Sequence, residues 1–215
     1  MNESRTLIGI FSGWQYPKRR EGCLKGWMTH LRKFPRFDAV FVFGVPRISR
    51  PERQGRCLFL PCPDAYQFLP WRTRLLCAWA VQQGYGQIVK CDDDTRWSLP
   101  RLANYDTGRA EYVGHPMAER EGTGYLPTPG ELEAKTNLYA SGGGYLLSPR
   151  AAKLISENLT VTEGFEDLEV GRVLRAAGIP LRPETTRMKM FAKADERPGP
   201  RNNWLYATPA VREPE

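Results

Sequence analysis

Short apolar runs recur through the first half of the chain and limit what it can fold into. They cover residues 6–11, 38–45, 56–62 and 86–91. Runs of this length bounded by glycine or proline are typical of buried strands, whereas residues 17–34 and 69–83 carry apolar side chains at the three- and four-residue spacing of a helix. Alternating strands and helices predict a parallel sheet of the α/β class.

The second half of the chain has a looser pattern. Residues 110–117 resemble a strand, residues 121–130 a loop rich in glycine, proline and threonine, and residues 139–148 a glycine hinge that leads into a short strand. Helical spacing returns over residues 149–159 and 166–178. These segments continue the predicted alternation toward the C-terminus.

The length and composition suit one soluble domain. A chain of 215 residues can bury a substantial core, and we expect one domain over residues 1–195 with a partly irregular tail over residues 196–215. No window reaches the roughly 18 apolar residues of a membrane helix, and the first apolar run is too short for a secretion signal. The five cysteines lack the spacing of a zinc site. We therefore expect a cytoplasmic protein with reduced thiols.

The charge of the chain points to an anionic ligand. The formal net charge is +7, and its basic residues are spread along the sequence rather than gathered in one block. Basic chains favour anionic partners, but the sequence has no aromatic-interleaved RNA signature and no basic helix at groove-reading spacing. A small phosphorylated ligand therefore accounts for the charge, and we expect no nucleic-acid partner.

Three consecutive aspartates directly follow the fourth apolar run: Asp92, Asp93 and Asp94. Adjacent carboxylates repel one another, so water, basic side chains or a metal ion must offset the cost. Alternation along a strand would send Asp92 and Asp94 to one side and Asp93 to the other. Two carboxylates could then share a hard divalent ion such as Mg²⁺ or Mn²⁺. A solvated acidic turn with nearby arginines is the alternative.

Two further segments permit either a functional or a structural interpretation. Three glycines at Gly142, Gly143 and Gly144 let the backbone approach a ligand closely, or they form a flexible hinge. Glu166 and Asp167 open a predicted helix, where carboxylates are favoured by capping and by the helix dipole. The same placement would keep a carboxylate ionised, as a general base requires.

Taken in order along the chain, six groups of residues resemble the motifs of glycosyltransferase family 31, the β-1,3-galactosyltransferase, N-acetylglucosaminyltransferase and Fringe-like group. They are IGIFSG with RREGCLKGW, FVFG, DAYQFLPWRT, KCDDD, YASGGGYLLS and EDLEVG. The resemblance covers residues 7–179. It implies a GT-A fold, in which helices flank a Rossmann-like mixed sheet. It also implies a nucleotide-sugar donor such as a UDP-sugar, a glycan acceptor, Mn²⁺ or Mg²⁺, inversion at the anomeric carbon and a β-1,3 linkage.

The resemblance also implies roles for individual residues. Asp94 would be the main metal ligand, with Asp92 near the metal or the ribose. Asp167 would be the base that takes the proton of the acceptor hydroxyl, and Glu166 would orient the acceptor or the base. The residues implied in donor binding or its supporting shell are Arg19, Arg20, Arg72, Lys90, Asp92, Asp93, Gly142, Gly143 and Gly144.

The sequence also departs from the family, and other interpretations stay open. Family members often carry a metal-binding histidine near the C-terminus, whereas the two histidines here are His30 and His115, and we expect His115 to be a loop or core residue. Arg72 stands where lysine is usual. One alternative is a nucleotidyltransferase, which would use the paired aspartates and metal without needing Asp167. The other is a non-catalytic module that binds a nucleotide or nucleic acid through positive charge.

Overall fold

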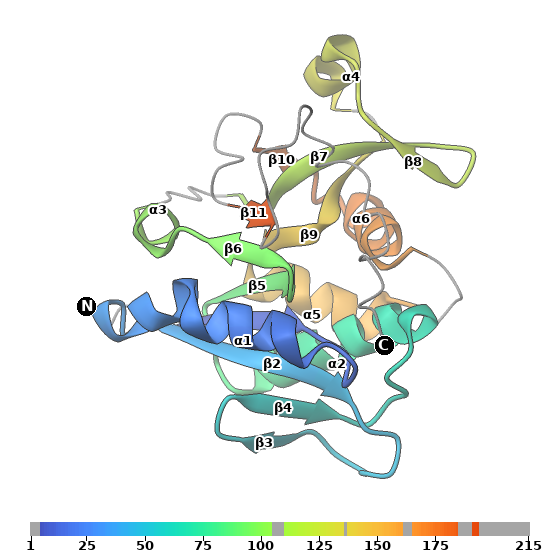
Figure 1. Ribbon diagram of the computed structural model, residues 1–215. Helices are drawn as coiled ribbons and strands as arrows, with labels where there is room; N and C mark the ends of the chain where they lie inside the picture. Colours follow the sequence, from blue (N-terminus) through green and yellow to red (C-terminus); the bar gives the residue numbers. More distant parts are fainter. Residues whose placement is uncertain (1–4, 105–109, 136, 161–164, 185–190, 194–215) are drawn as a thin grey trace.

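The computed structural model describes residues 5–104, 110–135, 137–160, 165–184 and 191–193. These residues form one large mixed sheet with helices on both faces, and a small two-stranded sheet lies beside it (Figure 1). The predicted α/β class is therefore confirmed, and the arrangement agrees with a Rossmann-like mixed sheet. The predicted tail over residues 196–215 lies outside the described residues.

The large sheet has the order β10-β7-β9-β5-β1-β2-β4-β3, and β8 pairs with β7. Its strands are β1 (Thr6–Phe11), β2 (Phe37–Gly44), β3 (Glu52–Gln54), β4 (Cys57–Leu60), β5 (Gln87–Asp92), β7 (Tyr112–Arg120), β8 (Thr123–Tyr125), β9 (Leu138–Leu147) and β10 (Arg182–Pro183). The small sheet joins β6 (Thr95–Trp97) to β11 (Phe191–Lys193) in antiparallel fashion. The four apolar runs of the first half are β1, β2, β4 and β5, as predicted.

These four strands are parallel to one another. β1 lies between β2 and β5, and β4 extends the sheet beyond β2. All six residues of β1 are buried, because helices cover both faces of the sheet. Their carboxyl ends share one edge, and the aspartates follow β5 at that edge.

The second half of the chain departs from the parallel sheet that the alternation of strands and helices predicts. β9 runs antiparallel to both β5 and β7, so the sheet is mixed. The predicted glycine hinge over residues 139–148 is instead part of this continuous strand, whose residues 138–140 and 144–147 pair with neighbouring strands. The β7 register shifts between Gly114 and Pro116, so β7 pairs with residues 138–140 and 145–147 but not with residues 141–144.

Helices cover the two faces of the sheet. Two helices lie together behind the sheet in Figure 1, while α1 crosses the front. The helices are α1 (Pro17–Lys25), α2 (Leu69–Gln82), α3 (Leu99–Ala103), α4 (Pro129–Ala134), α5 (Pro149–Asn158) and α6 (Glu166–Ala176), with short 3-10 helices η1 (Trp27–Lys33) and η2 (Tyr66–Phe68). The pair behind the sheet is α2 and α5. Alternate strand residues feed two cores, with Leu7 in the core beneath α2 and Ile8 in the core beneath η1.

The predicted helix over residues 17–34 is broken in two. α1 ends at Lys25, and η1 begins at Trp27. Gly26 between them has φ −94° and ψ −122°, which is neither helical nor extended, and a Cβ there would lie 2.6 Å from the carbonyl oxygen of Gly22. The break places Trp27, Met28 and Leu31 against the sheet as one apolar cluster.

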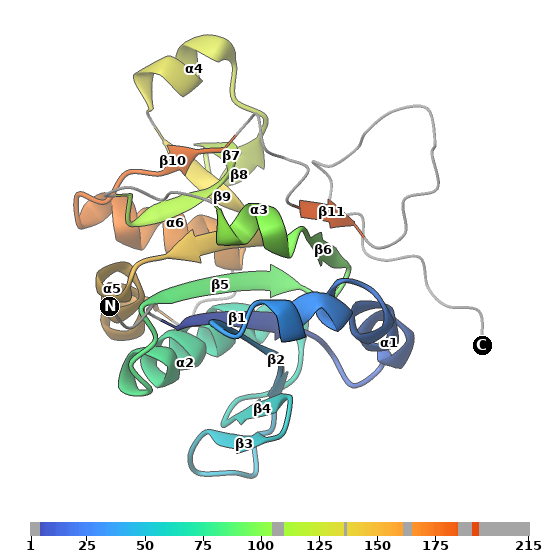
Figure 2. The same cartoon turned by 90° about the vertical axis from the view of Figure 1, so that its left-hand side faces the viewer.

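The end of the molecule farthest from β3 carries α4, which stands off from the main body, and β8, which pairs with β7 (Figure 2). A capping box between Thr128 and Glu131 starts α4. Among the helices that the structure describes, none is both long and apolar enough to cross a membrane.

Candidate functional site

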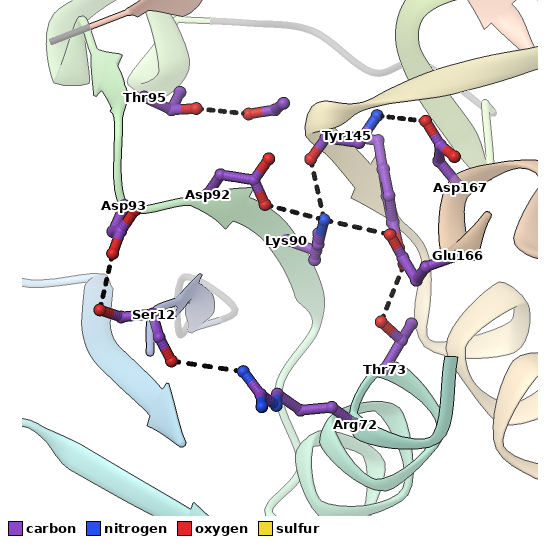
Figure 3. Close-up of polar contacts among 12 residues, drawn as sticks. Ser12, Arg72, Thr73, Lys90, Asp92, Asp93, Thr95, Tyr145, Glu166 and Asp167 are labelled. Carbon is purple, nitrogen blue, oxygen red and sulfur yellow. Dashed lines mark hydrogen bonds and ion pairs between the residues drawn. The ribbon is translucent and has the colours of Figure 1, made fainter. Parts of the chain in front are cut away.

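The site lies where β1 and β5 end, facing the beginning of α6 and the glycines of β9 (Figure 3). Asp92 is the last residue of β5, and Asp93 and Asp94 form the turn into β6. The chain alternates here, since Asp93 is buried while Asp92 and Asp94 are half-buried. The burial pattern agrees with an inward Asp93, whereas the expectation that Asp92 and Asp94 face the same side stays a prediction.

Asp93 faces the interior. Its carboxylate accepts a hydrogen bond from Ser12 Oγ at 2.7 Å and one from Arg19 Nη1 at 3.3 Å. Burial raises the pKa of Asp93 to about 6, although Ser12 and Arg19 act in the opposite direction. Asp93 thus ties the acidic turn to the loop after β1 and to α1, instead of pointing with Asp92 toward solvent.

Lys90 is the centre of the polar network. Its buried Nζ donates to Gly142 O at 2.8 Å and Asp92 Oδ1 at 3.1 Å, and lies 3.1 Å from Glu166 Oε2. An ammonium group has three protons, so these acceptors use them all. Burial by itself would lower the pKa of Lys90, but the charges of Asp92 and Glu166 outweigh burial and raise it. Lys90 therefore stays a cation, with its charge directed at protein groups.

Glu166, the first residue of α6, points inward as well. Its Oε1 accepts from Thr73 Oγ1 at 2.8 Å and from the hydroxyl of Tyr145, while Oε2 faces Lys90. The side chain is buried. Glu166 can thus position its neighbours, but the described contacts direct both of its oxygens toward protein partners.

Asp167 occupies a different environment, although it is the next residue. Its Oδ2 accepts from the backbone N–H of Gly142 at 2.8 Å, and its Oδ1 accepts from the N–H of Leu168 at 3.0 Å. Burial, followed by the charge of Glu166, raises the pKa of Asp167 to about 6. A half-buried carboxylate with this pKa is ionised at neutral pH and can accept a proton.

The backbone of Gly142 contacts both Asp167 and Lys90. Its N–H binds Asp167 and its carbonyl binds Lys90. A side chain at Gly142 would lie 3.3 Å from Asp167 Oδ2. The next carbonyl, of Gly143, accepts from Thr95 Oγ1 at 2.6 Å. The glycines therefore permit close contact between backbone and carboxylate where β9 separates from β7.

The three predicted donor-site arginines all contact the protein. Arg19 binds Asp93, and Arg20 Nη1 donates to Ser12 Oγ at 3.0 Å and to the carbonyl of Gly13 at 2.5 Å. Arg72 is buried, and it donates to Asp64 Oδ1 at 2.5 Å and to the carbonyl of Ser12 at 3.3 Å. In this structure they shape the loop after β1, as a supporting shell would.

The acidic turn offers two carboxylates for a divalent ion. The side chain of Asp92 is 38% exposed, with one oxygen on Lys90. Within the part of the chain that the structure describes, no group of three or more His, Cys, Asp or Glu side chains could hold a metal by itself. Asp92 and Asp94 fit a divalent ion only if phosphate oxygens and water supply the remaining ligands, as is usual for Mg²⁺.

Sequence reasoning missed several residues of this site. Thr73 and Tyr145 fix Glu166, and Ser12 fixes Asp93. Trp14 lies in the same loop as Ser12 and is 54% exposed. The sequence carried only a weak signal for Ser12, because a serine after an apolar run is common at a strand end.

Comparison with known proteins finds only distant structural similarities. Models of known protein families give no match, and neither do curated protein sequences. Among solved structures, the chain is similar to CMP:2-keto-3-deoxy-manno-octonic acid synthetase in complex with CTP, at 14% identity and a TM-score of 0.48, over 84% of this chain and 89% of that one. It is also similar to 2-C-methyl-D-erythritol 4-phosphate cytidylyltransferase from Thermus thermophilus, at 13% identity and a TM-score of 0.43, over 85% and 90%. A third similar structure is the galactosyltransferase LgtC in complex with donor and acceptor sugar analogs. Its sequence identity is 14% and its TM-score 0.40, and the match covers 82% of this chain and 72% of that one.

Proposed function

We propose that the protein is an inverting, metal-dependent glycosyltransferase that moves a sugar from a nucleotide sugar to a hydroxyl of a glycan acceptor. The observation that carries the proposal is the placement of Asp167. Its carboxylate lies at the beginning of α6 and accepts a hydrogen bond from the N–H of Gly142. The carbonyl of Gly142 accepts from Lys90, and Lys90 also donates to Asp92. A proton acceptor and an acidic turn are thereby held on either side of one buried lysine. The UDP moiety and the β-1,3 linkage follow from the family resemblance of the six motifs.

The proposed reaction is a single displacement. The acceptor hydroxyl oxygen attacks the anomeric carbon while the bond from that carbon to the phosphate oxygen breaks, and the electron pair leaves with the nucleoside diphosphate. Asp167 takes the hydroxyl proton as the new bond forms. Attack from the face opposite the leaving group inverts the anomeric centre. Glu166 would act as a positioning residue, because its oxygens face Thr73, Tyr145 and Lys90.

A divalent ion, when bound, would neutralise charge that develops on the departing diphosphate. Asp94 and Asp92 are the residues proposed to hold it. Lys90 and the three arginines, Arg19, Arg20 and Arg72, would keep the acidic turn and the loop after β1 in place, so that the phosphates meet a preformed edge of the sheet.

The decisive experiment measures nucleoside diphosphate release from a panel of UDP-, GDP- and dTDP-sugars, with and without Mn²⁺ and with mixed glycan acceptors. Asp167→Asn should lower kcat by about 10²- to 10⁴-fold, as expected for loss of a general base. Asp94→Ala should remove the dependence on Mn²⁺ together with most activity.

The matched control is Glu169→Gln. Glu169 lies on the same helix and pairs with Arg172 at 2.6 Å, and none of its described side-chain bonds involves the site residues named above, so this variant should keep full activity. Metal-dependent release that persists in Asp167→Asn would contradict the proposed base. Pyrophosphate release from a nucleoside triphosphate and a sugar 1-phosphate, without nucleoside diphosphate release from any nucleotide sugar, would favour nucleotidyl transfer. Nucleotide binding that requires no metal and occurs without turnover of any donor would favour a binding module.

A further inference from the structure

The loop after β1 presents an aromatic ring with one covered face. The indole of Trp14 stacks on Phe43, with ring centroids 4.6 Å apart and planes 22° apart, and it lies nearly parallel to Phe59 at 6.0 Å. Yet 54% of the surface of Trp14 is exposed. A large apolar residue that only covers a core would be expected to bury more of its area. The second face of the ring is thus open to a ligand.

The backbone of this loop is fixed on both sides of the ring. The N–H of Trp14 donates to Asp64 Oδ2 at 3.1 Å, and its carbonyl accepts from Arg20 Nη2 at 3.3 Å. Asp64 is itself held by the N–H of Gly44 at 3.0 Å and by Arg72 at 2.5 Å. A ring held in place before binding loses little conformational entropy when a ligand stacks on it.

The position of the ring relates it to the acidic turn. Two residues before Trp14, Ser12 donates to Asp93, and the N–H of Asp93 donates to the carbonyl of Phe11. The loop lies beside the end of β2 in Figure 1, at the edge of the sheet where β1 and β5 also end. In α/β sheets this edge is where ligands bind. The loop that carries Trp14 is therefore tied to the acidic turn at this edge of the sheet.

We infer that the open face of Trp14 is a stacking platform for the nucleobase of the donor nucleotide. The inference rests on the proposed function, which requires a nucleotide whose phosphates lie near Asp92. A nucleobase is flat and aromatic, so it matches the geometry of the indole–Phe43 stack. The platform belongs to the half of the site formed by β1, β2 and β4, while Asp167 lies on the other half with β9 and α6.

The test compares ligands that differ only by the base. UMP, CMP, GMP and AMP are titrated against ribose 5-phosphate, and the indole N–H resonances are followed by NMR, with the Trp14 signal identified by its loss in Trp14→Leu. We expect nucleotides to shift the Trp14 resonance and ribose 5-phosphate to leave it unchanged. Trp14→Leu, which keeps an apolar cover over Phe43, should weaken nucleotide binding about 5- to 150-fold, the range measured for base–aromatic stacking.

Trp14→Tyr retains an aromatic face and should restore most of the affinity. The control is Phe165→Leu, because Phe165 is 55% exposed but precedes α6 on the other half of the site; it should bind nucleotides as the wild type does. Three outcomes would overturn the inference. Trp14→Leu could weaken the binding of ribose 5-phosphate as much as that of nucleotides, or it could leave nucleotide binding unaltered. In the third, monosaccharides instead of nucleotides shift the Trp14 resonance. The first two outcomes leave the transferase proposal standing, and Trp14-dependent binding without sugar transfer would refute the transferase alone. A wild-type protein that binds no nucleotide would refute both.

Discussion

At the scale of single residues, Glu166 and Asp167 show how two adjacent carboxylates can acquire different tasks. Both begin α6, but successive residues of a helix project about 100° apart, so they face different surroundings. Glu166 meets Thr73, Tyr145 and Lys90 in the interior, whereas the hydrogen bonds described for Asp167 come from backbone N–H groups. One carboxylate is committed to the architecture and the other keeps the capacity to exchange a proton.

The pKa of Asp167 sets an expected pH dependence. A general base must be ionised, so kcat/KM should fall as the pH drops through about 6 and level off above pH 7. The measurement is a pH profile of initial rates on the donor identified by the panel, in Mn²⁺ at constant ionic strength. A flat profile between pH 5 and 8 would contradict the assignment of Asp167 as the base.

The same raised pKa predicts a cost in stability. Asp167 has a folded-state pKa of about 6 against an ordinary value of 3.8, so folding disfavours its ionised form, and stability declines as the pH rises from 3.8 through about 6. Asp167→Asn removes that decline. The difference in free energy of unfolding, variant minus wild type, should therefore be about 2–3 kcal/mol higher at pH 8 than at pH 4, which means that the variant gains relative stability as the pH rises. Urea denaturation at the two pH values tests this, and an equal difference at both would contradict it.

Lys90 should be needed mainly because Glu166 is buried beside it. Lys90→Met leaves Glu166 without its cation and should lower the free energy of unfolding by about 3–5 kcal/mol. Adding Glu166→Gln to Lys90→Met should recover part of that loss, since the remaining amide carries no charge. A double-mutant cycle by urea denaturation measures the coupling; strictly additive losses would show that the two side chains do not interact.

At the scale of elements, α6 reaches β9 closely because Gly171 has no side chain. A Cβ at Gly171 would lie 2.3 Å from Cβ of Tyr139, a contact that requires the helix or the strand to move. That movement would displace Asp167 from Gly142, because α6 and β9 carry the two residues. The close approach of helix and strand thus supports the geometry of the site.

Gly171→Ala should therefore destabilise the protein by about 1–3 kcal/mol, the usual cost of overpacking. Gly22 provides a matched control, since it lies in α1 and a Cβ there meets nothing within 4 Å. Gly22→Ala should stabilise the protein by up to about 1 kcal/mol through helix propensity. Thermal unfolding of the two variants checks both signs, and a stabilised Gly171→Ala would show that the contact can relax.

The elements also show which predictions a local pattern can support. α2 and α5 nearly match their predicted ranges, because their apolar spacing and proline and glycine signals act within the element. The prediction of a hinge at β9 was wrong, since three glycines have no intrinsic preference for a strand. The segment is a strand because residues on both sides of the glycines pair with β5 and β7. No local sequence pattern indicates which strands will be its neighbours.

At the scale of the whole molecule, Asp38 joins distant parts of the chain at the end of the sheet opposite the site. Arg53 of β3 donates to both of its oxygens at 2.7 Å, Arg5 donates at 3.0 Å, and the Tyr85 hydroxyl at 2.6 Å. Burial would raise the pKa of Asp38, but these hydrogen bonds and charges outweigh burial and lower it to about 2. Asp38 thus connects the edge strand β3 to Arg5, just before β1, and to Tyr85, just before β5.

The lowered pKa gives this cluster a defined pH window. Its stabilisation is complete above about pH 4 and is lost as the pH falls from there toward 2, when Asp38 becomes protonated. Asp38→Asn should lower the free energy of unfolding by about 2 kcal/mol at pH 6 and by much less at pH 2.5. Urea denaturation of both proteins at the two pH values measures the difference; a loss that does not shrink in acid would contradict the charge-based explanation.

Local sequence patterns were enough to specify the strands of the first half and the helices behind the sheet, whereas the family resemblance singled out Lys90, Glu166 and Asp167. Apolar spacing, capping and turn residues act over a few neighbours, so they can be read along the chain. Three-dimensional packing was needed to establish where the antiparallel strand β9 joins the sheet, that Asp93 and Glu166 face inward, and that Trp14 is held with one face open. Each of these depends on partners tens of residues away, and the direction of a polar side chain follows from the partner that compensates its burial.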